Sequence, residues 1–455
     1  MSGEEDAPLI ESRADLLEVM AVGSKPKSEW RVGTEHEKHV YRKAPLAPVP
    51  YAGDDGVHAL LQGIEGRTGW HPFFDRGNPI GLRNLGAVGG ISLEPGGQFE
   101  LSGAPQLTIH DAAAELDAHL EDCRIVGGPL NIHFLSLGVT PLWSVAEIAA
   151  MPKSRYGIMT RYMQQVGSLG TSMMYRSATV QANLDFSDEA DMVKKLRVSV
   201  ALQPIVTALF ANSPFVDGKP SGYLSFRSHI WLNTDNARTG MLPFAFEPGF
   251  GFDRYAEYAL DVPMYFVIRK GEYINVAGES FRAFMQGNLP QLPGVRPTVK
   301  DWENHLSTLF PEVRLKQFLE MRGADMGDAD SVLALSALWV GLLYDDAALD
   351  GAWQLVKDWT DEERQALRDE VPRTAIHTKF RNRTVAEIGD DVLALAREGL
   401  ERRARLHPLG RDETMYLAHV EETLDLRRTP AERWLERYHG EWAGDLSRIF
   451  DEAEI

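Results

Sequence analysis

Residues 33–41 read GTEHEKHVY, and this stretch decides how the chain is built. Its side chains alternate as they do in a β-strand, where residues two apart share a face, so Glu35 and Glu37 point the same way. Carboxylates so placed lie about 7 Å apart and repel by about 2 kcal/mol at an effective dielectric constant of about 20. One such strand alone is most simply a solvated outer face. Further carboxylates beside it would need cations.

Other segments extend the pattern outward from this strand. They do not follow a regular β-helix-β rhythm, and no Gly-rich phosphate loop follows any of them. This arrangement predicts an α+β fold with a largely antiparallel sheet backed by helices. The segments expected to be extended are 91–102, 180–186, 223–231, 263–269 and 318–322.

Polar side chains gather on one face of these predicted strands, and the turn Pro95-Gly96-Gly97 can bring two further glutamates onto it. All-oxygen ligands select hard ions such as Mg²⁺ or Mn²⁺ over zinc, and arginines suit carboxylate or phosphate groups. We interpret the set as a phosphoryl-transfer site without a P-loop. The carboxylates are Glu35, Glu37, Glu94, Glu100 and Glu320; the arginines are Arg227, Arg322 and Arg176; the amides are Gln181 and Asn183.

Helical signals dominate the remainder of the chain. Residues 188–210 predict a helix with Ser187 as its N-cap and a kink at Pro204. From about residue 331 onward, capping boxes beginning at Thr360, Thr384 and Thr429 precede apolar residues at helical spacing. We therefore expect a catalytic α+β core over 1–330 and a helical region over 331–455 packed on it.

Composition excludes several classes of protein. The 455 residues include 47 basic and 66 acidic ones, a formal charge of −19, which excludes nucleic acid and anionic membranes as expected partners. The one cysteine, Cys123, excludes an intramolecular disulfide and is most simply a small core residue. The N-terminal stretch MSGEEDAPLI lacks the features of a signal peptide, and no apolar run reaches the roughly 18 residues of a membrane span. These features predict a soluble protein in a reducing compartment.

At this point several stretches resemble the plant-type glutamate–cysteine ligases, which also occur in many bacteria. The resemblance implies the curved, largely antiparallel catalytic sheet of the glutamine synthetase type. It also implies ATP-dependent joining of the glutamate γ-carboxylate to the amine of cysteine through γ-glutamyl phosphate, the first step of glutathione synthesis. The matching stretches cover most of residues 30–350 and include GTEHEKHVYR, GGISLEPGGQFELSGAP, MPKSRYGIM, ANSPFVDGKPSGYLSFRSHIW and DWENHLSTLFPEVRLKQFLEMRGAD.

The resemblance implies roles for the polar face. The five glutamates would hold two or three Mg²⁺ ions, with Mn²⁺ as an alternative. Arg227 would grip glutamate, with Trp231 beside it, and Arg322 with Arg176 would stabilise the transferring phosphoryl group. Lys153 and Arg155 would meet the ATP phosphates, although a solvated loop explains them equally well.

Other interpretations stay open at this stage. Gln181 and Asn183 either orient substrate or satisfy a sheet edge, and Met174 with Tyr175 either meets the cysteine thiol or belongs to the core. The rival functions are a γ-glutamyl ligase for another amine or thiol pathway, a non-catalytic protein that binds nucleotide or metal, and a metal-dependent phosphohydrolase. We expect a monomer or homodimer.

This chain also departs from the plant pattern. Residues 326–332 differ from the Gly-Pro-Trp-Arg-Arg type of segment found there, the paired regulatory cysteines cannot exist, and a transit-like composition is missing. From these departures we predict a bacterial-type cytoplasmic enzyme without disulfide control.

Overall fold

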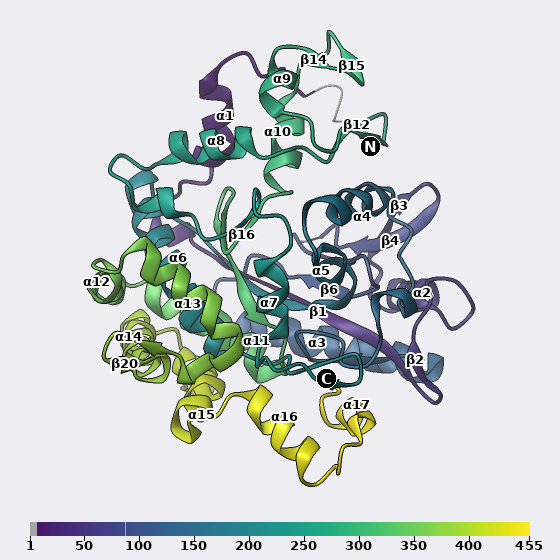
Figure 1. Ribbon diagram of the computed structural model, residues 1–455, viewed down its shortest axis with the longest axis vertical. Coiled ribbons are helices and arrows are strands. Elements are labelled where there is room, and N and C mark those ends of the chain that lie inside the picture. The colour runs from purple at the N-terminus through teal and green to yellow at the C-terminus, as the bar shows by residue number, and fades with distance from the viewer. Residues whose placement is uncertain (1–6, 87) are drawn as a thin grey trace.

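A single large sheet forms the centre of the computed structural model, which describes residues 7–86 and 88–455 (Figure 1). The first six residues of the stretch MSGEEDAPLI therefore lie outside the described residues. The sheet has ten strands; eight follow the order β17-β18-β8-β1-β6-β5-β4-β3, and β2 and β7 also pair with β1. All of its pairs are antiparallel, which confirms the predicted α+β class. The strands are β1 (Val32–Lys43), β2 (Leu46–Pro48), β3 (His71–Asp75), β4 (Asn78–Arg83), β5 (Gly90–Leu93), β6 (Phe99–Ser102), β7 (His133–Leu135), β8 (Thr179–Leu184), β17 (Val313–Leu315) and β18 (Leu319–Asp325).

Short strand pairs lie outside this sheet, and helices make up most of the remaining regular structure. The short strands are β9 (Phe215–Val216), β10 (Lys219–Pro220), β11 (Thr239–Gly240), β12 (Phe266–Arg269), β13 (Glu272–Asn275), β14 (Asn288–Leu289), β15 (Leu292–Pro293), β16 (Phe310–Pro311), β19 (Lys379–Phe380) and β20 (Arg383–Thr384). The α-helices are α1 (Arg13–Ala21), α2 (Val57–Thr68), α3 (Ile109–Gly127), α4 (Ser154–Val166), α5 (Gly170–Arg176), α6 (Glu189–Leu209), α7 (Phe226–Leu232), α8 (Phe252–Asp261), α9 (Phe281–Met285), α10 (Val299–Leu306), α11 (Ala329–Leu343), α12 (Asp346–Val356), α13 (Asp361–Thr374), α14 (Val385–Arg403), α15 (Ala418–Leu426), α16 (Pro430–His439) and α17 (Ile449–Glu452).

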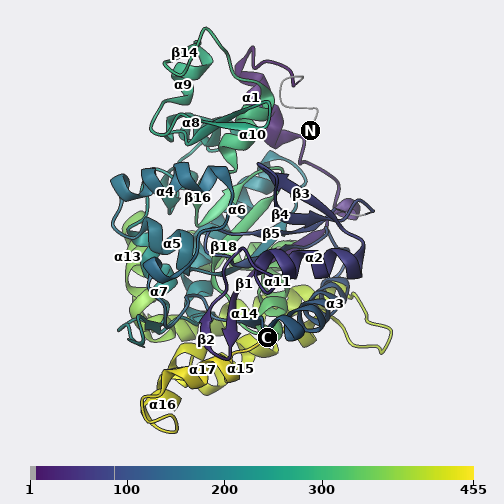
Figure 2. The ribbon, with the colours of Figure 1, turned by 90° about the vertical axis from the view of Figure 1, so that its right-hand side faces the viewer.

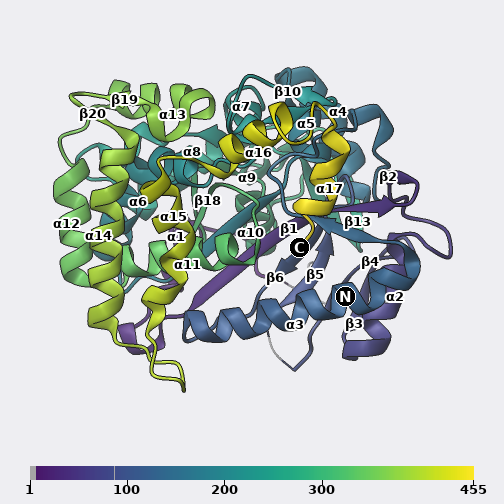
Figure 3. The ribbon, with the colours of Figure 1, turned by 90° about the horizontal axis from the view of Figure 1, so that it is seen from below.

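Strand β1 sets the two faces of the sheet. Thr34, His36 and Lys38 are buried on the face that α3 and α11 cover, and α3 crosses the strands in the view from below (Figure 3). The Thr34 hydroxyl lies 2.7 Å from that of Ser336 on α11, and the Lys38 ammonium lies 2.9 Å from Nδ1 of His36. Because side chains alternate along a strand, Glu35 and the next glutamate face the opposite side.

The opposite side of the sheet receives α4, α5 and α7; in Figure 1, α4 and α5 lie above β6, and α7 lies level with β1. Helices α1, α8, α9 and α10 gather at one end of the molecule, and the C-terminal helices α15–α17 lie at the other end (Figures 1 and 2). The polar face of the sheet therefore lies between the strands and helices α4, α5 and α7.

Two sequence predictions of local structure are wrong, and one is refined. Residues 223–231 are not a strand: they lead into α7, because the Ser225 hydroxyl caps the helix by accepting from the backbone of Ser228, where the apolar alternation also breaks. The N-cap of α6 is Asp188 in place of Ser187, since its carboxylate accepts from the backbone of Asp191. The predicted strand 91–102 is a hairpin of β5 and β6.

The C-terminal region is helical, as predicted, apart from the short β19–β20 pair. The capping boxes at Thr360, Thr384 and Thr429 are all present. Within the described part of the chain, no single helix has the length and apolar character of a membrane span; α11 and α12 reach them only together, across a bend of 91°. Cys123 is buried. One apolar cluster includes residues from both sides of position 330, so the division into a core over 1–330 and a helical region over 331–455 stays a prediction.

The contact between α11 and α14 generates a stability prediction. A Cβ at Gly399 would lie 1.9 Å from the carbonyl oxygen of Gly341, so the two helices touch backbone to backbone. We expect Gly399→Ala to lower the free energy of unfolding by about 1–3 kcal/mol through overpacking. Urea unfolding of the purified variant measures this loss.

The matched control is Gly66→Ala on the exposed side of α2, where a Cβ meets nothing within 4 Å. There alanine is expected to raise the free energy of unfolding by up to about 1 kcal/mol through helix propensity. Equal effects at the two glycines would contradict the close packing of α11 on α14.

Candidate active site

Neighbouring strands bring the predicted carboxylates and amides into register on one face. Glu37 lies opposite Glu100 of β6, and Glu35 lies opposite Gln181 of β8. The Ser92 hydroxyl of β5 donates to Glu100 at 2.8 Å and lies 3.5 Å from Glu94, whose backbone closes the hairpin turn through Gly97. Gly97 has a φ of +83°, a conformation that favours glycine. The turn therefore places both hairpin glutamates beside β1.

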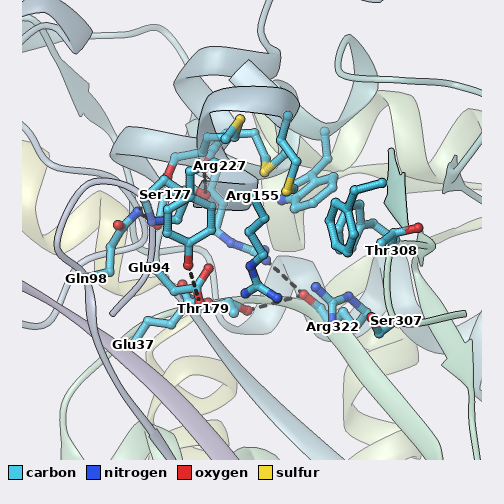
Figure 4. Close-up of a pocket in the computed structure, with 18 residues that line it drawn as sticks. Glu37, Glu94, Gln98, Arg155, Ser177, Thr179, Arg227, Ser307, Thr308 and Arg322 are labelled. Carbon is cyan, nitrogen blue, oxygen red and sulfur yellow. Dashed lines mark hydrogen bonds between the residues drawn. The ribbon is translucent and has the colours of Figure 1, made fainter. Parts of the chain in front are cut away.

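Among the described residues, two of the pockets on this face border the glutamates, and the first is rich in arginine. We call it the arginine pocket; its volume is about 120 Å³ (Figure 4). Figure 4 shows labelled side chains of opposite charge, Glu37, Glu94, Arg155 and Arg322, around the same space. The lining residues are Glu37, Glu94, Pro95, Gln98, Arg155, Tyr156, Met159, Met173, Met174, Ser177, Thr179, Arg227, Trp231, Phe266, Ser307, Thr308, Phe310 and Arg322.

The second, which we call the wide pocket, has a volume of about 570 Å³. On β1, Gly33 and Glu35 line the wide pocket, and Glu37 lines the arginine pocket. Similarly, Ser92 of β5 lines the wide pocket, and Glu94, just after β5, lines the arginine pocket. The two pockets therefore follow each other along the same strands and meet at the glutamates. Its lining residues are Lys25, Arg31, Gly33, Glu35, Phe73, Leu82, Arg83, Asn84, Leu85, Val88, Gly89, Gly90, Ile91, Ser92, Ser102, Gly103, Pro105, Asn183, Asp185 and Phe318.

Like charges crowd where the pockets meet. Burial, together with the charges of Glu100 and Glu94, raises the pKa of Glu37 well above its ordinary value. Burial and the charges of Glu94 and Glu35 raise the pKa of Glu100 to about 8. Thr179 relieves Glu37 only in part, by donating its backbone N–H at 3.0 Å. Burial and the neighbouring carboxylates thus disfavour the ionised forms of Glu37 and Glu100.

This donor set fits a hard divalent cation, because carboxylate oxygens that repel one another gain most from such an ion. Glu35, Glu37, Glu94 and Glu100 supply the oxygens. Among residues 7–86 and 88–455, no three acidic, histidine or cysteine side chains are already grouped as a closed set of ligands. The glutamates would therefore have to converge on an ion.

Lys153 and Arg155 approach this cluster from α4 and the residue before it. The Lys153 ammonium lies 3.1 Å from the hydroxyl of Tyr156, and burial together with the charge of Arg155 lowers the pKa of Lys153 to about 8. Arg155 lines the arginine pocket. Both basic side chains are thus turned toward the site, not toward solvent.

Arg227 is a buried arginine of the arginine pocket whose guanidinium is only partly hydrogen-bonded. Its side chain is 2% exposed, and it donates through Nη2 to the backbone oxygen of Arg322 at 3.0 Å. The same oxygen accepts from the hydroxyl of Thr179, and both bonds are drawn in Figure 4. Nε and Nη1 of Arg227 have no partner among the described residues. Burying a guanidinium without partners is costly, so these N–H groups favour an anionic ligand.

Arg322 is aimed by its own strand. The pairing of β18 with β8 shifts register between Met321 and Ala324, a bulge of the kind that redirects a side chain. Its Nη1 donates to Gln181 at 2.5 Å and to Glu320 at 2.7 Å.

Glu320 lies among cations. Burial alone would raise its pKa, but Arg314, Lys316 and Arg322 outweigh burial and hold the pKa well below its ordinary value. Nη2 of Arg314 donates to Glu320 at 2.8 Å. These pairs separate Glu320 from the crowded glutamates, so its predicted metal role stays a prediction.

Other predicted residues divide between the site and its surroundings. Trp231 and Met174 line the arginine pocket, and Asn183 donates to Glu35 at 2.8 Å. Arg176 lines neither pocket; it pairs with Asp217 at 2.8 Å. Tyr175 also lines neither of the two pockets, and its hydroxyl lies 2.8 Å from that of Thr160.

Sequence reasoning missed several polar residues of the site. Arg314 of β17 and Lys316 directly after the strand are two residues apart, a signal that a search for alternating cations would have found. Lys25 and Arg31 of the wide pocket lie in the segment just before β1, whereas Arg83 ends β4, and no local pattern joins the three.

Comparisons with known proteins show the family of the chain. The model of the glutamate-cysteine ligase family 2 matches residues 31–452. The chain is 52% identical over 441 residues to the chloroplastic glutamate–cysteine ligase of Nicotiana tabacum, covering 97% of this chain and 82% of that one. It is 51% identical to the Arabidopsis thaliana protein of the same name, with the same coverage.

Solved structures share the fold at low identity. The glutamate–cysteine ligase of Francisella tularensis, solved in complex with AMP, superposes with a TM-score of 0.54 at 13% identity, covering 93% of this chain and 88% of that one. The bifunctional glutathione synthetase of Pasteurella multocida gives a TM-score of 0.51 at 14% identity, over 97% of this chain and 53% of the other.

The predicted cytoplasmic location is wrong by the same comparisons. The relatives from tobacco, tomato, rice and Arabidopsis are all chloroplastic by name. The prediction rested on loop 326–332, on the missing cysteine pair and on N-terminal composition, and none of these features determines the compartment.

The crowded glutamates predict a pH-dependent stability difference in EDTA. The folded-state pKa of Glu100, about 8, exceeds the ordinary value of 4.5, so its protonated form stabilises the fold below about pH 4.5, and this contribution is lost as the pH rises through about 8. Glu100→Gln mimics the protonated acid. We expect urea unfolding to show a more stable variant at pH 8 and a smaller gain at pH 5.

Glu121→Gln, an exposed position on α3, serves as the control and is expected to change stability little at either pH. A gain for Glu100→Gln that is the same at pH 5 and pH 8 would contradict the crowding of charge.

Proposed function

The chain belongs to the glutamate-cysteine ligase family 2, and from this premise we propose that it joins L-glutamate to L-cysteine with cleavage of ATP. The γ-phosphoryl group of ATP passes to a γ-carboxylate oxygen of glutamate and leaves ADP. The amine of cysteine then attacks the carbonyl carbon, phosphate departs, and the amine loses a proton. The products are γ-glutamylcysteine, ADP and phosphate. The observation that carries the proposal is the buried Arg227 beside the crowded glutamates.

Arg227 offers glutamate an anion site. Its free Nε and Nη1 face the arginine pocket, with Trp231 on the next turn of α7 as a second wall. A planar guanidinium binds a carboxylate through two parallel hydrogen bonds, which also orients it. We assign the α-carboxylate of glutamate to Arg227, which leaves the γ-carboxylate free to point toward the glutamates of the sheet.

ATP suits the wide pocket by size and by position. Phe73, Leu82 and Ile91 supply apolar wall for a base, and Lys25, Arg31 and Arg83 supply positive charge. The nucleotide would extend its phosphates along β1 toward Glu35, where the arginine pocket begins. That placement brings the γ-phosphoryl group to the acceptor carboxylate, and positioning of this kind is a large part of catalysis.

We assign Mg²⁺ to Glu35, Glu37, Glu94 and Glu100. When bound, the ion would neutralise negative charge shared by the phosphates and these carboxylates. Arg322 and Arg155 lie on the walls of the same pocket and stabilise charge on the transferring group. We assign Glu320 to orienting Arg322, through the pair at 2.7 Å, and leave it out of the metal ligands.

The cysteine side chain suits the apolar end of the arginine pocket. Met159, Met173 and Met174 line it together with Phe266 and Phe310. Thioether and aromatic groups are soft, polarizable neighbours for a thiol.

The test of the function is phosphate release by the purified chain with ATP and Mg²⁺. We expect release only when both glutamate and cysteine are present, and loss of release in EDTA. Turnover only with another amine would replace cysteine as the substrate, and ATP binding without turnover in every substrate combination would favour a non-catalytic protein. Release without glutamate would indicate a phosphohydrolase.

Arg227→Lys tests the glutamate site separately. A point ammonium cannot reproduce the paired hydrogen bonds of the guanidinium, so we expect the KM for glutamate to rise about tenfold or more. Arg238→Lys, which alters another fully buried arginine that lines neither pocket, is the matched control. An unchanged glutamate KM in Arg227→Lys would refute the assignment.

A further inference from the structure

A buried carboxylate outside both pockets organises the helix that carries Arg227. Asp325 ends β18 and is 1% exposed. Its Oδ2 accepts from the backbone N–H of Asn212 at 2.9 Å and from the hydroxyl of Ser213 at 2.6 Å, and its Oδ1 accepts from the hydroxyl of Ser225 at 2.8 Å. Asp325 lines neither the arginine pocket nor the wide pocket.

The two serines pass this anchoring on to the first turn of α7. The Ser225 hydroxyl accepts from the backbone N–H of Ser228 at 3.1 Å, and the Ser213 hydroxyl accepts from the backbone N–H of Arg227 at 3.1 Å. A serine hydroxyl has one donor and two acceptor sites, so each serine can serve the carboxylate and the helix at once. One carboxylate thus fixes the start of α7 through two relays.

Strand β18 therefore holds Arg227 at two points. Asp325 fixes its backbone through the serines, and three residues earlier the carbonyl oxygen of Arg322 accepts from its guanidinium at 3.0 Å. Movement of the helix start relative to the strand would turn the free Nε and Nη1 away from the pocket.

The surroundings of Asp325 are built tightly enough to keep it in place. A Cβ at Gly138 would lie 2.5 Å from its Cγ, so only glycine allows this approach. Burial raises the pKa of Asp325, and the charge of Arg227 lowers it. The guanidinium and the carboxylate therefore also attract each other electrostatically.

We infer that Asp325 is a positioning residue for glutamate binding, which acts through Ser213 and Ser225 to aim Arg227 into the arginine pocket. The inference rests on the proposed function, because glutamate is assigned there to Arg227. Asp325 touches no substrate in this account. Its effect is on the KM for glutamate more than on kcat, since an interaction that binds substrate and transition state alike changes KM alone.

The test is initial-rate kinetics of Asp325→Asn with each substrate varied in turn. Asparagine keeps the shape of the side chain but replaces one acceptor oxygen by a donor that the serine hydroxyls cannot satisfy in their present roles. We expect the KM for glutamate to rise about tenfold or more, and the KM values for ATP and cysteine to change less than about threefold.

Asp345→Asn is the matched control. It removes the N-cap carboxylate of α12, whose residues line neither pocket, and so weakens a helix start elsewhere in the fold. We expect it to lower the free energy of unfolding without changing the KM for glutamate. This result would distinguish the loss of a helix cap from a change in the orientation of Arg227.

A second variant, Ser213→Ala with Ser225→Ala, decides the matter if Asp325→Asn does not fold. It leaves the carboxylate and removes both relays, and the same selective rise in the KM for glutamate is expected. Adding Asp325→Asn to it should change that KM little further, because the three side chains act as one unit. A common rise in all three KM values, or an unchanged glutamate KM in both variants of an active enzyme, would overturn the inference. An inactive wild-type chain would instead overturn the proposed function on which it rests.

Discussion

Repulsion among Glu37, Glu94 and Glu100 is the constraint around which the rest of the site is arranged. Each lies against another carboxylate at the middle of the sheet, and burial strengthens that repulsion because less water screens it. The chain relieves part of this repulsion through backbone and serine donors, through Lys153 and through Arg227. Carboxylates that still repel one another favour a bound divalent cation. The formal charge of −19 therefore fits an anionic substrate, provided that cations accompany it into the site.

The division of the face into two pockets follows from the period of the strands. Residues 33, 35 and 37 of β1 point to the same side, and the first two border the wide pocket while the third borders the arginine pocket. A molecule in one pocket thus meets a molecule in the other at the glutamates. The opposite side of β1 is also polar, with Thr34 bonded to α11 and His36 to Lys38. The Thr34 contact holds the strand against α11, so its glutamates keep their direction.

Patterns that repeat within one segment could be predicted from sequence. Alternation identified β1 and β8, and capping boxes identified α13, α14 and α16. What the sequence could not show depends on partners distant in the chain. The segment with Arg227 resembles a strand until Asp325 and its serines are seen to hold the helix start. The pairing of β17 with β18 brings Arg314 to Glu320, an ion pair that no local pattern predicts, and the metal role of Glu320 stays a prediction. Arg176, predicted to be catalytic, is turned toward Asp217 by α5. The basic residues of the wide pocket come from separate segments, so no local pattern marks them.

The proposed reaction depends on direct transfer of a phosphoryl group from ATP to a glutamate carboxylate held between the two pockets. Glutamate labelled with ¹⁸O in its γ-carboxylate tests this most directly, by mass spectrometry of the phosphate released in the presence of ATP, Mg²⁺ and cysteine. One labelled oxygen is expected in each phosphate, because the bridging oxygen of the acyl phosphate departs with the phosphoryl group. Unlabelled phosphate formed together with γ-glutamylcysteine would contradict direct transfer.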